Sequence, residues 1–229
     1  MAIDREPRFV GVDGTQGRWV AIAIDARGEY ASAGLFDSLD EMVAAHSGAE
    51  CLAIDVPIGL LDAGVRAADA EAKRRLGRRG STVFLTPTRA VIEAPSYDEA
   101  ARIARASTGK GIARQSYALR TNILAADALR SDARIHEVHP ELAFAALAGR
   151  VLQSKKRSWR GACERRELLE RAGLCVPSDI GVAGDVPVDD VLDAAVCAWS
   201  ARRIAEGAAE HVPDEPELDE TGRPIAIWF

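Results

Sequence analysis

The residues best suited to chemistry in this sequence are acids that end apolar stretches. Asp13 and Asp55 each follow a short run of apolar residues, as expected at the end of a buried strand. Asp190 and Asp193 are three positions apart, so on a helix their side chains point the same way. Buried carboxylates destabilise a fold unless a cation lies among them, and Mg²⁺ and Mn²⁺ prefer such oxygen ligands. The acids therefore predict a divalent-metal site, provided that the fold brings them together.

Each of these acids also has a purely structural interpretation. Asp13 directly before a glycine is typical of a turn, and Asp55 suits the cap of a loop. Asp190 stabilises the start of a helix through the helix dipole. Glu137, on a predicted strand, suits an ion pair with an arginine. The metal prediction therefore depends on the whole set of acids and on no single member.

The elements expected to position these acids form a mixed α/β fold. Strands are predicted at residues 8–13, 19–25, 30–36 and 51–56, and Ser38 begins a helix between the third and the fourth. Residues 64–130 are rich in Ala and Arg and predict three helices. A fifth strand follows at 134–139, and helices are expected from Pro140, at 164–172 and at 187–205. This order differs from the strand–helix alternation of a doubly wound dinucleotide-binding fold.

Composition and charge exclude several classes of protein. The chain has 229 residues, is 48% hydrophobic and has no apolar run long enough to span a membrane. Its first residues include acids and exclude a signal peptide, so a cytoplasmic location is expected. The four cysteines form no CxxC pair, which argues against zinc. The net charge of −6 argues against non-specific nucleic-acid binding, but basic runs at 73–79 and 155–166 suit either a polyanionic substrate or solvated helix faces.

Four segments that follow one another carry a family resemblance: Val10-Gly11-Val12-Asp13-Gly14, Ala53-Ile54-Asp55-Val56-Pro57-Ile58-Gly59, Glu137-Val138-His139-Pro140-Glu141 and Asp189-Asp190-Val191-Leu192-Asp193-Ala194-Ala195. In this order they resemble a family of uncharacterised proteins that are described as predicted ribonuclease-H-like nucleases. Residues 66–89, and Lys155-Lys156 with the helix after it, are also similar to the family's pattern. The helix that carries Asp190 and Asp193 resembles that of Holliday-junction resolvases.

The resemblance implies a ribonuclease-H-like α/β fold, in which helices flank a mixed β-sheet. It implies a single domain, residues 1–229, with a helical insertion at about 62–131 after the fourth strand. Asp13 would share two metal ions, Asp55, Asp190 and Asp193 would complete the site, and Glu137 or Glu141 would act as a further ligand or as the base that orients a water. Two such ions, about 3.5–4 Å apart, would support the hydrolysis of a phosphodiester.

The resemblance also implies a nucleic-acid partner, with DNA or RNA and endo or exo cleavage left open. Arg66, Arg89, Lys155 and Lys156 would bind substrate phosphate, although each suits a surface ion pair as well. The aromatic content of 5% leaves few platforms for base stacking, so strong binding of single strands is not expected. No membrane partner is expected, and the oligomeric state stays open.

Two other functions remain alternatives to a metal-dependent nuclease. Residues 14–17 form a turn after the first strand, and a similar turn binds phosphate in actin-like ATPases and sugar kinases, which share this general fold. Such proteins usually have two domains of this kind, so 229 residues is short for them. The third possibility is a binding module on the same fold without catalysis, which would hold the acids apart or pair them with arginines.

Overall fold

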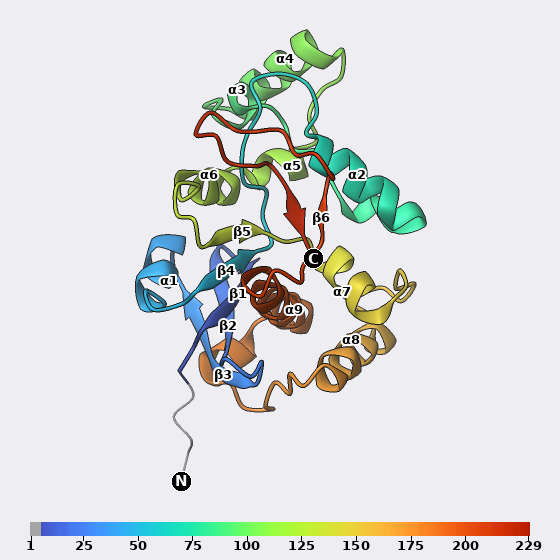
Figure 1. Cartoon of the computed structure of the whole chain (residues 1–229). Coiled ribbons are helices and arrows are strands. Elements are labelled where there is room, and N and C mark those ends of the chain that lie inside the picture. Colours follow the sequence, from blue (N-terminus) through green and yellow to red (C-terminus); the bar gives the residue numbers. More distant parts are fainter. Residues whose placement is uncertain (1–5) are drawn as a thin grey trace. The chain divides into compact units, whose positions relative to one another are not determined.

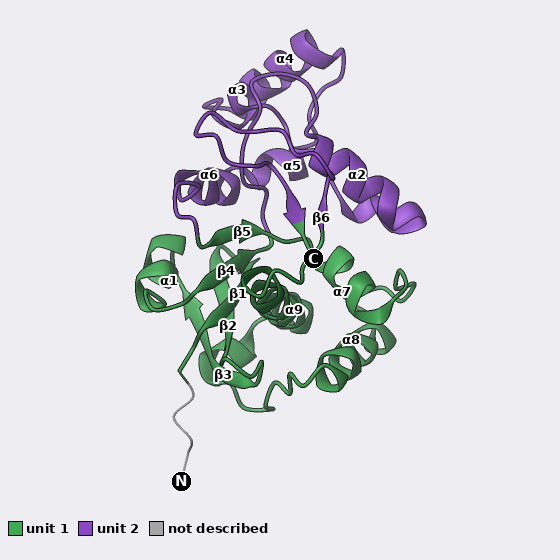
Figure 2. Ribbon diagram, in the orientation of Figure 1, with its two compact units in different colours: residues 1–55, 134–210, 228–229 green, residues 56–133, 211–227 purple. Residues whose placement is uncertain are grey.

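The chain forms two compact units, which are coloured separately in Figure 2. The computed structural model describes residues 6–229. The first unit takes the N-terminal part of the chain up to Asp55, Arg134–Glu210 and Trp228–Phe229. The second unit takes Val56–Ala133 and His211–Ile227, so it includes the predicted insertion, 62–131, and a segment near the C-terminus.

The first unit is built on a five-stranded sheet that confirms the predicted mixed α/β class. Its strands are β1 (Phe9–Thr15), β2 (Arg18–Ile24), β3 (Tyr30–Phe36), β4 (Cys51–Ile54) and β5 (Ile135–Glu137), in the order β3-β2-β1-β4-β5 (Figure 1). β2 is antiparallel to both of its neighbours, β1 and β3, whereas β4 and β5 run parallel to β1. The carboxyl ends of β1, β4 and β5 therefore meet at one edge of the sheet.

A two-residue turn joins β1 to β2. Gln16 and Gly17 both have positive φ angles, 49° and 81°, as a turn that follows the right-handed twist of a hairpin requires. The turn fixes the register in which Val12 pairs with Ala21 and Asp13 with Val20. Because successive side chains alternate between the two faces of a sheet, this register also decides which face Asp13 occupies.

The long helix α9 (Val188–Ala205) packs across β1, β2 and β4 (Figure 1). Gly11 makes this close approach possible, because a Cβ added there would lie 2.0 Å from the Ala198 nitrogen and 2.1 Å from the Ala194 oxygen. Ala194 and Ala198 of α9 are fully buried, and their backbone lies against Gly11. Helix and strand are thus close enough for acids on both to meet.

In its described residues, the first unit has four further helical elements besides α9. They are α1 (Leu39–Ala45), α7 (Pro140–Ala148), α8 (Trp159–Arg171) and the 3₁₀ helix η2 (Gly181–Asp185). The Ser38 side chain caps α1, as the sequence predicts, by accepting a hydrogen bond from the Glu41 amide. α7 and α8 both pack against α9 and against each other.

The second unit is mostly helical, with α2 (Ala67–Leu76), η1 (Gly77–Thr82), α3 (Arg89–Ile92), α4 (Tyr97–Thr108), α5 (Arg114–Ala118) and α6 (Arg120–Ala128). Five α-helices thus replace the three predicted ones, because the turns near Pro87 and Pro95 leave α3 as a separate single turn and α5 ends at Ala118. The short strands β6 (His211–Val212) and β7 (Ile227–Trp228) lie near the C-terminus. Within the described part of the chain, every helix is too short or too polar to cross a lipid bilayer.

Candidate metal centre

Three aspartates from distant parts of the sequence meet in the first unit. Asp13, Asp55 and Asp193 each place one carboxylate oxygen so that the three atoms lie within 4.8 Å of one another. Asp13 and Asp193 are buried, and Asp55 is partly exposed. The sheet explains the first contact, because Val12 pairs with Ile54 in the parallel register and the residues after them, Asp13 and Asp55, come next to each other. The Asp55 amide also donates to the Val12 carbonyl at 2.9 Å.

The helix α9 supplies the third aspartate and a fourth acid beside it. Asp193 lies one turn before Cys197, and Cys197 is one of the α9 residues that approach Gly11. Asp190, one turn earlier on α9, is at the border of burial with 9% exposure and interacts electrostatically with Asp13 and Asp55. The predicted convergence of Asp13, Asp55, Asp190 and Asp193 is therefore present in the structure, with Asp190 at its edge.

The proximity of the carboxylates changes their pKa values. Burial raises the pKa of Asp13 well above its ordinary value, and the charges of Asp55 and Asp193 raise it further. Burial, reinforced by Asp190, raises the pKa of Asp55 to about 6 despite the opposing effect of Lys156. Burial likewise raises the pKa of Asp193 to about 7, although Lys156 acts against the shift. These carboxylates resist full ionisation because the single lysine does not balance their charge.

Lys156 is the cation that the chain itself supplies to the cluster. Its Nζ atom lies 2.5 Å from Asp193 Oδ2 and 3.7 Å from Asp189 Oδ2. Burial opposes the charge on Lys156, but the neighbouring carboxylates, Asp193 first, raise its pKa above the ordinary value. Arg157 extends the contact at the surface, with Nε 3.0 Å from Asp189 Oδ2. Lys156, predicted as a phosphate ligand, is thus a direct neighbour of the acids.

One carboxylate oxygen of the cluster gives more direct evidence for a bound metal ion than the others do. Asp193 Oδ1 is buried and has no hydrogen-bond partner among residues 6–229. A buried carboxylate oxygen without a donor destabilises the fold, and a hard divalent cation is the ligand that would satisfy it. Together with the oxygens of Asp13 and Asp55 it forms an acidic triad that could hold a metal ion.

The two glutamates that were predicted as a further ligand or base differ in their position relative to the triad. The parallel register pairs Glu137 with Ile54, and Ile54 with Val12, so the Glu137 side chain is on the sheet face opposite Asp13. Glu141 is close enough to raise the pKa values of Asp55 and Asp193. However, its Oε1 atom accepts a hydrogen bond of 2.6 Å from the fully buried Arg165.

The predicted phosphate ligands in the second unit have acidic partners there. Arg66 is buried, with Nε 3.7 Å from Asp69 Oδ1. Arg89 donates to Asp127 Oδ2 at 2.9 Å and also lies near Glu93. These contacts match the structural interpretation of both arginines, and phosphate binding by either stays a prediction.

Three residues beside the acids were not predicted as site residues: Arg157, Arg165 and Cys197. Arg165 neutralises Glu141, and the ion pair of Asp189 with Arg157 closes the outer edge of the cluster. Cys197 is fully buried on α9, where burial and then the charges of Asp55 and Asp13 raise the pKa of its thiol well above the ordinary value. Cys197 is four residues after Asp193, so both lie on one face of the helix. This spacing could have identified Cys197 from the sequence.

Comparison with known proteins leaves the activity open. The family model described as "Protein of unknown function (DUF429)" matches residues 11–218. This match includes Asp13, Asp55, Asp190 and Asp193. No curated protein and no solved structure gives a match to the chain.

Proposed function

Since the chain belongs to the DUF429 family, whose description names no activity, we propose a function from its carboxylates: a metal-dependent nuclease on a ribonuclease-H-like fold. The observation that carries the proposal is the triad of Asp13, Asp55 and Asp193, with its ligand atoms within 4.8 Å and a buried, unsatisfied oxygen on Asp193. The strand order and the mixed sheet are consistent with that fold. The order of the sequence segments supports the same superfamily.

In this proposal Asp13, Asp55 and Asp193 would be the residues that hold Mg²⁺ or Mn²⁺. A divalent cation in such a site lowers the pKa of a bound water and neutralises charge on a phosphodiester. Hard cations of this kind prefer carboxylate oxygens as ligands. Among the described residues, the three ligand atoms of the site are all carboxylate oxygens, with no histidine nitrogen or thiolate. The donor set therefore fits magnesium or manganese.

The base of the reaction is best assigned to Asp190. Glu137 faces away from Asp13, and Glu141 is bound to Arg165, so neither suits the role. Burial raises the pKa of Asp190, an effect that the Thr15 side chain partly offsets and Asp189 reinforces. A carboxylate with a raised pKa at the border of the site is suited to accept the proton of an attacking water at one of its oxygens.

Lys156 would contact the substrate from the same site. Its ammonium group has three donors, of which one reaches Asp193, and its side chain is 34% exposed. The remaining donors can bind a phosphate oxygen or stabilise the leaving oxygen. The lysine also lowers the repulsion between a phosphodiester and four neighbouring acids.

The test is cleavage of a panel of nucleic acids, with DNA and RNA in single-stranded, duplex, hybrid and branched forms. We expect cleavage with Mn²⁺ or Mg²⁺ that falls at least about 100-fold in Asp13→Asn, because one metal ligand is lost. Asp185→Asn, an exposed acid on η2, is the control that keeps full activity. Failure to cleave any member, or cleavage that Asp13→Asn leaves intact, would refute the proposal. Binding of labelled ATP in place of cleavage would instead support the actin-like alternative.

A further inference from the structure

Trp159 is unlike the other tryptophans of the chain. Trp19 is buried with 4% exposure, and Trp199 and Trp228 are partly buried against other rings or guanidinium groups. Trp159 is 85% exposed at the first position of α8. Both faces of its indole ring are therefore open to a partner that can stack on them.

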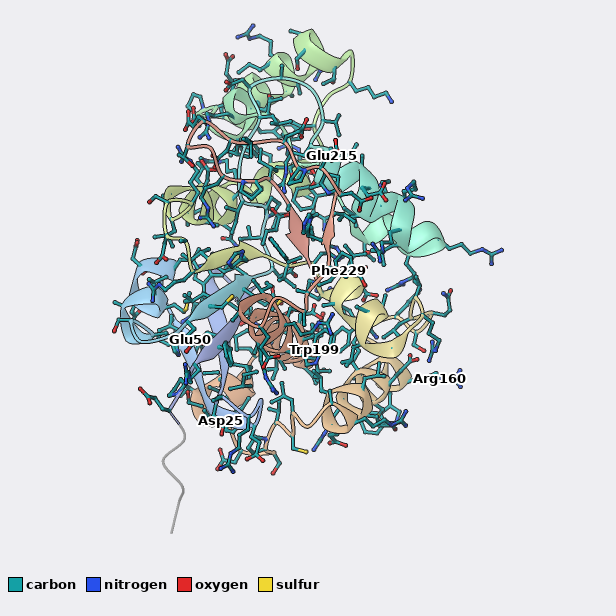
Figure 3. All side chains as sticks on the ribbon, viewed as in Figure 1. Asp25, Glu50, Arg160, Trp199, Glu215 and Phe229 are labelled. Carbon is teal, nitrogen blue, oxygen red and sulfur yellow. The ribbon has the colours of Figure 1, made fainter. Side chains whose placement is uncertain are left out.

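The chain around Trp159 is basic, although the protein as a whole is acidic. Residues 142–163 contain no Asp or Glu, and they include Arg150, Lys155, Lys156, Arg157 and Arg160. Lys155 and Arg160 are exposed and form no ion pair among residues 6–229. Figure 3 shows Arg160 projecting from the outer side of α8, away from α9. This combination of one aromatic platform and unpaired cations is complementary to a nucleic-acid strand.

The same segment is attached to the candidate metal centre. Lys156 contacts Asp193 and Arg157 contacts Asp189. The loop before α8 therefore lies directly beside the acidic cluster. Trp159 is three positions after Lys156, and such a segment spans at most about 11 Å between Cα atoms. Trp159 is therefore within reach of a strand whose phosphate lies at the centre.

Local contacts hold this segment in one conformation. The Lys155 carbonyl accepts hydrogen bonds from the Ser158 amide at 2.9 Å and from its hydroxyl at 2.7 Å. A Cβ at Gly161 would lie 2.0 Å from the same carbonyl, so only glycine fits. Arg165 donates to the carbonyls of Ser154 and Gly161, at 3.3 and 3.1 Å. The indole is thus presented on a preorganised turn, which lowers the entropy lost on binding.

We propose that Trp159 stacks on an unpaired nucleobase of the substrate, while Lys155 and Arg160 bind the neighbouring phosphates. The proposal rests on the proposed function, since it places the base next to the phosphate to be cleaved. It also specifies the substrate class, because the face of a base is open to an indole only where the strand is single or splayed. The enzyme would thus act on single-stranded or unpaired regions.

The experiment measures the affinity of fluorescently labelled oligonucleotides in Ca²⁺, so that binding is observed without relying on turnover. Trp159→Ala should weaken the binding of a single strand by about 5- to 150-fold, as loss of one stacked base predicts. Trp159→Phe should keep most of the affinity. Binding to a fully paired, blunt-ended duplex should change less than about twofold, since its bases are stacked inside the helix. Val182→Ala removes another exposed apolar side chain of the same unit, with 66% exposure, and serves as the matched control.

The outcomes separate this inference from the nuclease proposal. Selective loss of single-strand binding in Trp159→Ala without cleavage by the wild type would support the stacking site and refute the nuclease. Cleavage by the wild type, with single-strand affinity equal in Trp159→Ala and Val182→Ala, would overturn the stacking site alone. A dimer in sedimentation that Trp159→Ala dissociates, with nucleic-acid affinity unchanged, would assign the tryptophan to a second copy of the chain and would also overturn it.

Discussion

Because the carboxylates of the centre lie so close together, we predict that Asp55→Asn stabilises the fold. Without metal and near neutral pH, the variant should be more stable than the wild type. The pKa of Asp55 is about 6 in the folded chain, against an ordinary value of 3.8. A carboxyl group whose pKa is raised by folding binds its proton more tightly in the native state. Its ionisation above about pH 6 therefore destabilises the fold, and removal of the charge relieves this effect.

The shift sets the size of the expected effect. A difference of about two pKa units corresponds to about 3 kcal/mol at a pH above both values. This is an upper limit, because Asp55 is partly exposed and an asparagine amide must itself be hydrogen-bonded there. We expect a gain of about 1–2 kcal/mol, which raises the midpoint of thermal unfolding by roughly 2–8 °C for a chain of this length.

The assay is thermal unfolding in EDTA and in excess Mn²⁺ at several pH values. The gain of Asp55→Asn should be full above about pH 7 and should vanish below about pH 3, where Asp55 is protonated in both folded and unfolded states. With Mn²⁺ the order should reverse, because metal that binds only the native wild type stabilises it in proportion to the logarithm of its concentration. Asp185→Asn is the matched control, since Asp185 is an exposed acid of the same unit.

Two results would refute this reasoning. If Asp55→Asn unfolds at a lower temperature than the wild type in EDTA at neutral pH, the carboxylates are not in conflict. If Mn²⁺ raises the midpoint of Asp55→Asn as much as that of the wild type, Asp55 is not a metal ligand.

Three further predictions concern the same centre. Metal affinity should rise with pH between about 5 and 8, since carboxylates with raised pKa values must lose protons to bind, and calorimetry in two buffers of different ionisation enthalpy should show proton release. Lys156→Met should lower metal-free stability by about 1–3 kcal/mol in denaturant titrations, because Asp193 loses its cation while Lys156 is itself 34% exposed. It should also enlarge the stabilisation by Mn²⁺, and an unchanged midpoint would contradict the ion pair. Gly11→Ala should prevent folding, because the new Cβ would overlap the α9 backbone at Ala198; a folded variant by circular dichroism, with wild-type metal affinity, would show that α9 does not pack as described.

The aspartates of the centre were predictable because each has a local signal. Asp13 and Asp55 directly follow apolar runs that form β1 and β4, and adjacent parallel strands bring the ends of such runs together. Asp190 and Asp193 share a helix face through their spacing alone. In each case the signal for the single residue lies within a few positions, whereas the meeting of the two strands with α9 depends on the tertiary structure.

Glu137 and Glu141 were not predictable in the same way, because their positions depend on distant partners. The face that Glu137 occupies follows from its pairing with Ile54, and a shift of one residue in that register would move it to the side of Asp13. Glu141 is bound by Arg165, which lies on another helix. The sequence shows that each glutamate is near a strand or helix end, but it does not show the partner that decides its role.

The basic segment before α8 connects the charge of the whole chain with the proposed chemistry. A protein of net charge −6 with four acids in one site repels a polyanion, so the proposed activity requires positive charge close to the centre. Lys156 supplies part of it inside the cluster, and the metal would supply the rest. Glu141 contributes through Arg165, since that ion pair holds the turn that presents Lys156. Glu141 is thus connected with the site through the loop that Arg165 holds, and its role as a metal ligand stays a prediction.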